Sequence, residues 1–173
     1  MKMKNRSIRF VLFLILLIVM HLAIERIDRS PANGEEQTKD GSRAKYIPFP
    51  NELKKYEAYA WGIIKLTDFN RSYKATIGLR VKEKWLRLLD GPSTKNKLVA
   101  TQKANFIAVN SCKQNDCDTD HILILFDPSI NKCWALLVEN GVIAWLGDPD
   151  DWMKNLLREL GRLTWPSASS DRK

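Results

Sequence analysis

The chain has 173 residues, of which 45% are hydrophobic and 28% charged, enough for one globular domain beyond a hydrophobic N-terminus. Its formal net charge of +8 is concentrated at one end: residues 1–30 hold six of the 28 Lys and Arg and two of the 20 Asp and Glu, which leaves +4 for residues 31–173. Such a surface lacks the dense basic clusters with interleaved aromatic residues that nucleic-acid binding needs, so we expect no nucleic-acid partner.

The N-terminal segment, residues 1–27, is predicted to be a signal peptide or a signal anchor. Basic residues precede a fifteen-residue apolar run from Phe10 to Ile24, whose one polar member is His21. This length suits a cleaved signal better than a spanning helix, but no small-x-small cleavage site follows, so a retained membrane anchor through residues 10–24 stays open. Either outcome exports the rest of the chain. We therefore expect a periplasmic protein, either secreted or tethered to the inner membrane.

Residues 28–45 separate this segment from the rest of the chain. They contain almost no side chain that a core would bury and several residues that interrupt regular structure. We expect a flexible linker here. A globular domain is then placed at residues 46–165, followed by a disordered tail at residues 166–173.

The first part of the predicted domain is helical. One apolar helix face is indicated by the spacing of Leu53, Tyr56, Tyr59 or Ala60, and Ile63. A second helix is predicted over residues 71–79. The chain then reaches a strong turn signal, Asp-Gly-Pro, at residues 90–92.

The middle of the domain predicts consecutive strands with short connections, which makes them antiparallel neighbours. The pair Asn140-Gly141 is favoured in hairpin turns in which both central residues have a positive φ. The strands are expected at residues 98–102, 105–110, 121–126, 133–138 and 142–146.

A C-terminal helix is predicted after the last strand. Residues 148–151, Asp-Pro-Asp-Asp, supply a cap, a first-turn proline and acidic groups that suit the helix dipole. The apolar face consists of Trp152, Leu156, Leu157 and Leu160. Helices packed on an antiparallel sheet of about five strands make the fold class α+β.

Export changes how the three cysteines are interpreted, because thiols pair in an oxidising compartment. Cys112 and Cys117 lie close together in a segment rich in turn formers, and we predict a disulfide between them. This bridge would close a short ring and stabilise the fold by about 2 kcal/mol on the loop-entropy estimate. Cys133 remains, in a strand-like segment, and is predicted to be a buried free thiol.

The segment between these two cysteines is the candidate functional element. It lies between two predicted strands, so we expect it at the tip of a hairpin that projects from the sheet edge. A covalently closed tip loses little conformational freedom when it docks on a partner. The alternative is a stapled surface turn without a partner. The predicted partner-binding loop consists of Cys112, Lys113, Gln114, Asn115, Asp116 and Cys117.

The segment from Asn105 to Cys117, the strands after it and residues 145–149 (Trp-Leu-Gly-Asp-Pro) resemble the inhibitor of vertebrate lysozyme family, Ivy. The resemblance spans residues 71–161, and the family signature is Cys-Lys-Pro-His-Asp-Cys on a loop before a strand. Both cysteines match by position, as do the lysine and the aspartate. Gln114 replaces the family's proline, and Asn115 replaces its central histidine.

The resemblance implies a protein inhibitor that inserts this loop into the active-site cleft of a lysozyme-type muramidase, with no catalytic activity and no cofactor or metal. The family's histidine bonds the catalytic carboxylates, whereas Asn115 offers only neutral hydrogen bonds, which are roughly half as strong. Inhibition of c-type lysozyme is therefore expected to be weakened or retargeted, and a lytic transglycosylase is the alternative partner. Asp118 and Asp120 beside the loop would face a cationic lysozyme.

A zinc site is a rival interpretation. Three cysteines and His121 offer the ligand types of a Cys3His set. Their spacing lacks the repeated two-to-four-residue knuckles of structural zinc sites, and export would oxidise the cysteine pair first.

Two further interpretations belong to other classes. An enzyme would have His121 as its one candidate base outside the N-terminal segment, and no nucleophile elbow, phosphate loop or metalloprotease helix accompanies it. A binding module that keeps the fold but has lost lysozyme recognition is favoured by Asn115. Trp61 and Trp165 are left open as core or interface residues, and a homodimer is left open as well.

Overall fold

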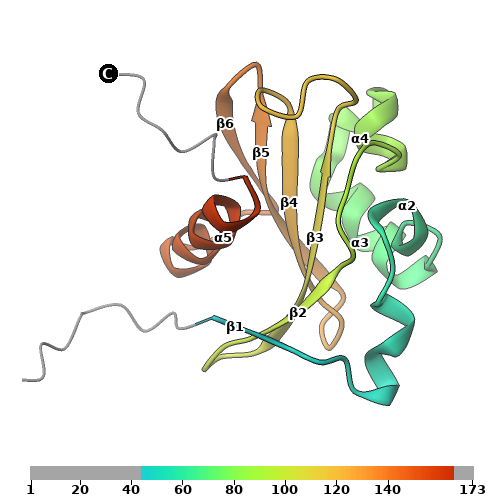
Figure 1. Cartoon of the computed structure of the whole chain (residues 1–173), viewed down its shortest axis with the longest axis vertical. Helices are drawn as coiled ribbons and strands as arrows, with labels where there is room; N and C mark the ends of the chain where they lie inside the picture. The colour runs from blue at the N-terminus through green and yellow to red at the C-terminus, as the bar shows by residue number, and fades with distance from the viewer. Residues whose placement is uncertain (1–43, 166–173) are drawn as a thin grey trace, which may run out of the picture. The chain divides into compact units, whose positions relative to one another are not determined.

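A six-stranded antiparallel sheet forms the centre of the computed structural model, which describes residues 44–165 (Figure 1). Each strand pairs with the next one along the chain, so the order is β1-β2-β3-β4-β5-β6 and β3 and β4 lie in the middle. The strands are β1 (Lys45–Ile47), β2 (Lys97–Ala100), β3 (Asn105–Cys112), β4 (His121–Asp127), β5 (Lys132–Glu139) and β6 (Val142–Leu146).

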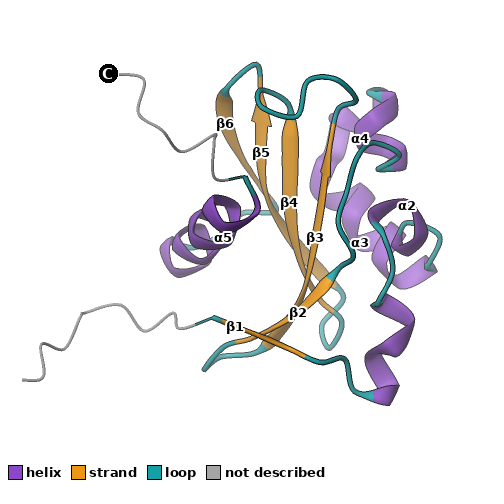
Figure 2. Cartoon of the chain, viewed as in Figure 1, coloured by secondary structure: helices purple, strands orange, loops and turns teal. Residues whose placement is uncertain are grey.

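Helices cover both faces of this sheet, which confirms the α+β class (Figure 2). One face carries α2 (Ala60–Ile63), α3 (Thr67–Ile77) and α4 (Lys84–Leu88), and the other carries α5 (Asp151–Thr164). Two 3-10 helices, Asn51–Tyr56 and Gly78–Lys82, flank the short helices. The predicted second helix is α3, which begins earlier than expected.

The additional strand is β1, so the sheet has six strands rather than the expected five. It begins at Lys45, which the sequence placed at the end of the linker. All three of its residues are exposed, so the segment shows no alternation of buried and exposed side chains that would mark a strand. Its pairing with β2, in which Tyr46 lies opposite Val99, creates the strand.

Two hydrophobic cores lie on the two faces of the sheet, because successive strand residues point to opposite sides. On β4, Ile122 and Ile124 pack in the core under α2, α3 and α4, whereas Leu123 and Leu125 pack in the core under α5. Every residue of β4 is buried. This explains its nearly continuous apolar sequence, which a strand covered on both faces requires.

Helix α5 packs its apolar side on the sheet as predicted, with Leu156, Leu157 and Leu160 buried. Its beginning differs from the prediction. Asp150 is the N-cap, and its side chain accepts a hydrogen bond from the backbone N–H of Met153 at 2.7 Å. The preceding proline therefore lies outside the first turn.

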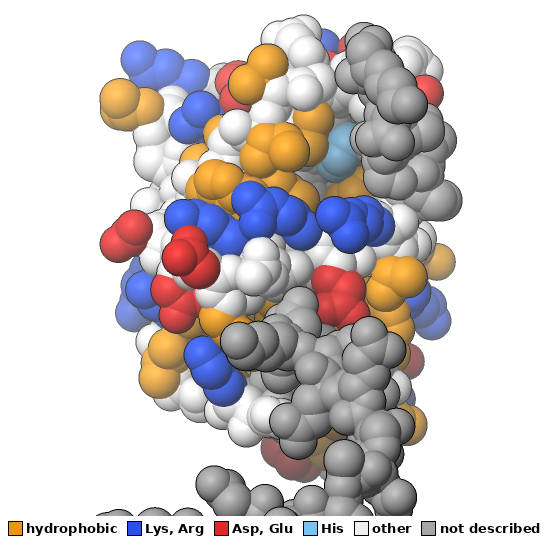
Figure 3. Space-filling model, turned by 90° about the vertical axis from the view of Figure 1, so that its left-hand side faces the viewer, with side chains coloured by type: hydrophobic (Ala, Val, Ile, Leu, Met, Phe, Trp, Pro, Cys, Tyr) orange, Lys and Arg blue, Asp and Glu red, His pale blue; other side chains and the backbone are white. Residues whose placement is uncertain are grey.

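The outer side of α5 is basic. Lys154, Arg158 and Arg162 recur at every fourth position, so they lie on one side of the helix. Figure 3 shows Lys and Arg side chains in a row across this face of the molecule, with hydrophobic side chains above the row. Arg158 packs over the ring of Trp145 on β6, with 4.9 Å from the guanidinium carbon to the ring centroid.

The single amphipathic helix predicted from Leu53 to Ile63 is wrong. The chain instead forms a 3-10 helix and then the separate short helix α2. Asn96, which is buried, donates its side-chain N–H to the carbonyl of Tyr56 and its backbone N–H to the carbonyl of Ala58. These carbonyls pair with a distant residue, so the helix is interrupted between them.

The predicted signal segment, the linker up to residue 43 and the tail at residues 166–173 lie outside the described residues. Between residues 44 and 165, none of the helices has the length and apolar character needed to cross a membrane.

Candidate functional site

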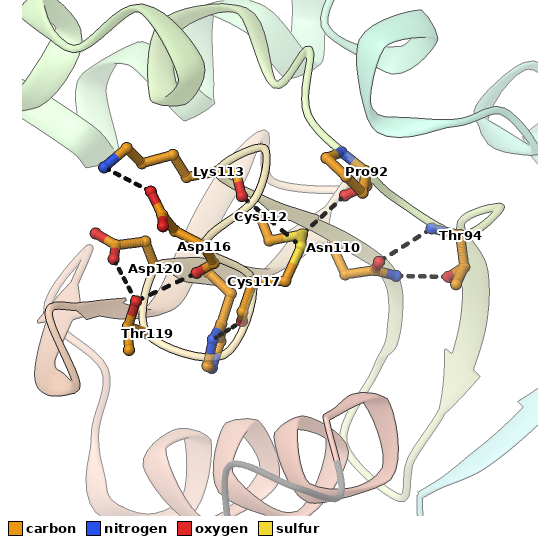
Figure 4. Close-up of a disulfide and its surroundings, with 10 residues drawn as sticks. Pro92, Thr94, Asn110, Cys112, Lys113, Asp116, Cys117, Thr119 and Asp120 are labelled. Atoms are coloured by element: carbon orange, nitrogen blue, oxygen red, sulfur yellow. Dashed lines mark hydrogen bonds and ion pairs between the residues drawn. A yellow bond between two sulfur atoms is a disulfide. The ribbon is translucent and has the colours of Figure 1, made fainter.

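Cys112 and Cys117 form a disulfide at the connection between β3 and β4, as predicted (Figure 4). Cys112 is the last residue of β3, and its Cα lies 4.9 Å from that of Cys117. Because β3 and β4 are the two middle strands, the loop projects from the end of the sheet and not from its edge as expected. Both strands that hold the loop are buried, so its two ends are firmly fixed.

Backbone hydrogen bonds give the loop its shape. The N–H of Asp116 donates to the carbonyl of Lys113 at 3.0 Å, and the N–H of Lys113 donates to the carbonyl of Asp120 at 2.9 Å. Asn115 has a φ of 70°, in the left-handed region that asparagine tolerates better than most residues. The tip is therefore a tight turn that ends in two exposed side chains, Gln114 and Asn115.

The two charged side chains of the loop bind each other. The Nζ atom of Lys113 lies 3.1 Å from an Oδ of Asp116, and both side chains are about half exposed. The hydrogen bond that Lys113 donates to this carboxylate, together with the negative charges of Asp116 and Asp120, raises the pKa of Lys113. The cation and the carboxylate thus offset each other, and the neutral amides of Gln114 and Asn115 form the leading end of the loop.

A segment from before β2 supports the base of the loop. The N–H of Cys112 donates to the carbonyl of Pro92 at 3.1 Å. The side chain of Asn110 accepts from the N–H of Thr94 at 3.1 Å and donates to its Oγ1 at 2.7 Å, as Figure 4 shows. A Cβ on Gly91 would lie 1.7 Å from the carbonyl oxygen of Cys112, so only glycine fits here. Sequence reasoning noted the turn at Gly91 but did not connect it with the loop.

His121 lies under the loop and has a structural environment. Its Nδ1 lies 2.9 Å from the carbonyl oxygen of Cys117, and its ring stacks on Trp165 with 4.3 Å between centroids. Burial lowers the pKa of His121, against the opposing effects of the Cys117 carbonyl and of Asp118 and Asp120. A neutral ring that donates its Nδ1–H to Cys117 accounts for these contacts.

The four residues considered as zinc ligands, the three cysteines and His121, do not form a metal site. Two of the four are joined in the disulfide, and Cys133 is a buried free thiol on β5, as predicted. Burial raises the pKa of Cys133, which disfavours the thiolate that metal binding requires. Within residues 44–165, no group of three His, Cys, Asp or Glu side chains is arranged to hold a metal ion.

A hollow that the sequence did not predict lies next to the loop. We call it the loop hollow; its volume is about 390 Å³. Gln114 of the loop forms part of its lining, together with Tyr59 and Trp61 from the helical side. Trp61 is 49% exposed, and its ring stacks on that of Tyr59 with 5.7 Å between centroids. The remaining lining residues are Asp90, Gly91, Pro92 and Ser93.

A comparison with known protein families shows which family this chain matches. Residues 68–167 match the family model described as inhibitor of vertebrate lysozyme (Ivy). The chain belongs to the Ivy family. No curated protein matches the chain. The Ivy match includes α3 to α5 and the disulfide loop, and it agrees with the resemblance seen in the sequence. Ivy membership supports a role as a lysozyme inhibitor, with a protein partner of lysozyme type, rather than a role as an enzyme.

Proposed function

We propose that this protein inhibits a lysozyme-type muramidase from the periplasm by inserting its disulfide loop, residues 112–117, into the active-site cleft. The observation that carries the proposal is the tip itself. Gln114 and Asn115 are exposed at the end of a turn that a disulfide closes and two buried strands hold. A preorganised tip of this kind loses little entropy on binding, so a small contact yields useful affinity.

The chemistry of the tip sets the strength of this inhibition. The cleft of a muramidase contains two carboxyl groups that carry out glycoside hydrolysis. Asn115 donates neutral hydrogen bonds to such groups, whereas the family's histidine adds a positive charge. Because hydrogen bonds between charged partners are roughly twice as strong, we expect this chain to inhibit c-type lysozyme weakly.

Asn115 also favours a second candidate function, in which the loop controls a lytic transglycosylase of the same cell. Such an enzyme binds the same glycan in a comparable cleft. A neutral tip suits a cleft whose acidic group stays protonated, because an amide pairs with a carboxylic acid through two neutral hydrogen bonds.

The test compares three forms of the full-length chain, solubilised in a mild nonionic detergent, in a cell-wall clearing assay. They are the wild type, the Asn115→His variant and the Asn131→His variant, each titrated against a c-type lysozyme and a lytic transglycosylase. Asn131 is a matched control, because it is also exposed and has a φ of 51°, but it lies in the turn between β4 and β5. Histidine is one of the residue types that are enriched in this backbone conformation, so both variants should fold.

We expect Asn115→His to strengthen inhibition of c-type lysozyme about tenfold, equivalent to one charge-assisted hydrogen bond, while Asn131→His leaves it unchanged. Inhibition of the transglycosylase alone by the wild type would select the second candidate. If neither enzyme is inhibited by the wild type or by Asn115→His, insertion into a muramidase cleft is excluded.

A further inference from the structure

A basic hollow lies on the helical side of the molecule and has no part in the insertion proposed above. Its volume is about 480 Å³, and it is lined by residues of α2, α3, α4 and the segments after them. Figure 1 shows these helices together on one side of the sheet. We refer to the hollow as the basic hollow and define it by Trp61, Lys65, Lys74, Arg87, Leu88 and Asp90.

The basic hollow adjoins the loop hollow, because Trp61 and Asp90 line both. A protein surface that covers Gln114 at the loop therefore extends across Trp61 toward the basic hollow. Trp61 is 49% exposed and Leu88 is 38% exposed. An exposed tryptophan beside polar groups is typical of the centre of protein interfaces, where aromatic side chains contribute most of the binding energy.

Positive charge dominates the basic hollow. Lys65, Lys74 and Arg87 are exposed, and Asp90 is the one carboxylate among the lining residues. Within residues 44–165, no ion pair shorter than 4.0 Å involves any of the three cations. Lys65 instead lies over the ring of Trp61, with Nζ at 5.6 Å from the centroid. The three cations are thus available to an anionic partner.

We propose that the basic hollow receives acidic side chains of the same muramidase whose cleft the loop enters. This inference rests on the proposed function, because the loop contact is what places the partner over the hollow. Complementary charge steers encounter and fixes orientation, whereas like charges placed together cost binding energy. The hollow therefore selects a muramidase that is acidic beside its cleft and disfavours a strongly cationic lysozyme.

The test measures equilibrium binding of the full-length chain, in nonionic detergent, to a cationic c-type lysozyme and to a lytic transglycosylase of acidic isoelectric point. The variant combines Lys65→Glu, Lys74→Glu and Arg87→Glu. The matched control combines Lys45→Glu, Lys103→Glu and Lys132→Glu, which changes the net charge equally. These three lysines are exposed and line neither hollow. Thermal unfolding of each variant checks that the fold is kept.

We expect the hollow variant to bind the acidic transglycosylase at least about tenfold more weakly and the cationic lysozyme more tightly, with less than about a twofold change in the control. Added salt should weaken the wild-type complex toward the level of the hollow variant, because screening removes the same attraction. A set with neutral glutamine at the three positions should give an intermediate loss.

Any of four results would overturn the inference. If both triple variants lose affinity equally, only net charge matters. If the hollow variant binds both enzymes as the wild type does, while Asn115→Asp, which places a like charge against the cleft carboxylates, abolishes binding, the hollow plays no role and the loop proposal stands. If the hollow variant loses binding only to soluble glycan fragments with carboxylate-bearing stem peptides, the hollow is a glycan site. A wild type that binds neither enzyme overturns the loop proposal as well.

Discussion

The β3–β4 loop and the β5–β6 turn lie at the same end of the sheet, and the N–H of Gly141 in the turn donates to the carbonyl of Thr119 in the loop at 3.0 Å (Figure 1). The turn is shaped by its own residues, since Asn140 and Gly141 both have positive φ, at 50° and 76°, as the sequence predicts. The loop is shaped by a disulfide and by contacts with Gly91 and Pro92, about twenty residues away in the sequence.

The two connections therefore depend on different parts of the chain. A change in the turn acts locally. The shape of the loop, and therefore any partner contact that it makes, depends on a segment that belongs to the helical side of the molecule.

The largest effect is expected from Gly91→Ala. A Cβ there would meet the Cys112 carbonyl oxygen at 1.7 Å; the oxygen belongs to backbone and the Cβ is bonded directly to backbone, so no side-chain rotation relieves the contact. We expect a loss of about 3 kcal/mol or more in the free energy of unfolding, as for overpacked sites. Urea unfolding measures this loss. A cost below about 1 kcal/mol would contradict the close contact of this segment with the loop.

The second prediction removes the covalent bond with Cys112→Ser and Cys117→Ser together. We expect a stability loss of about 2 kcal/mol, because the unfolded chain regains the freedom of a short ring. The wild type should show a similar loss when a reductant is added. The double variant is the control for reduction. It keeps the free thiol of Cys133 but has no disulfide, so its stability should not change when the reductant is added.

Sequence reasoning succeeded where structure depends on neighbouring residues. The strand at residues 142–146, the Asn140-Gly141 turn and the disulfide were all predicted because their signals lie within a few residues. The break between the 3-10 helix and α2 was missed, since it depends on hydrogen bonds from Asn96, some forty residues away in the sequence. Strand β1 was missed because its residues are exposed and its partner is distant.

The site was predictable to the same extent. The Cys112–Cys117 bridge and its place between two strands followed from the sequence, while the support by Gly91 and Pro92 and the two hollows did not. The partner-binding role of the six loop residues stays a prediction. These features join segments that lie far apart along the chain. Trp61 was the one available signal, and the sequence left open whether it belongs to the core or to an interface.

The third prediction concerns the turn alone. Gly141→Ala places a Cβ at a φ of 76°, which costs about 1 kcal/mol for a residue other than glycine. We expect this loss in urea unfolding, with affinity for the partner unchanged. A change in affinity as large as that of Gly91→Ala would show that the two connections are not independent.

The smallest effect is expected from a change in pH. It concerns the β3–β4 loop alone, because His121 contacts Cys117 of that loop. Burial lowers the pKa of His121 below its ordinary value, so the unfolded chain takes up a proton first as the pH falls. The contribution of His121 is therefore present above pH ~6.5 and decreases as the pH falls toward the lower folded pKa. We expect a shallow decline in thermal stability below this pH.

The control for this titration is His121→Gln, which keeps a side-chain N–H for the Cys117 carbonyl and does not titrate. Its stability should show less dependence on pH in the same range. An equal decline in both proteins would mean that other groups cause it.

The pairing of Lys113 with Asp116 has a consequence for how target choice can diverge within this fold. With both charges satisfied inside the ring, positions 114 and 115 are exposed and contribute no formal charge of their own. New side chains at these two positions would alter which partner is recognised, while the strands beneath keep their packing. Partner specificity can therefore change by substitution at two positions without a change in the fold.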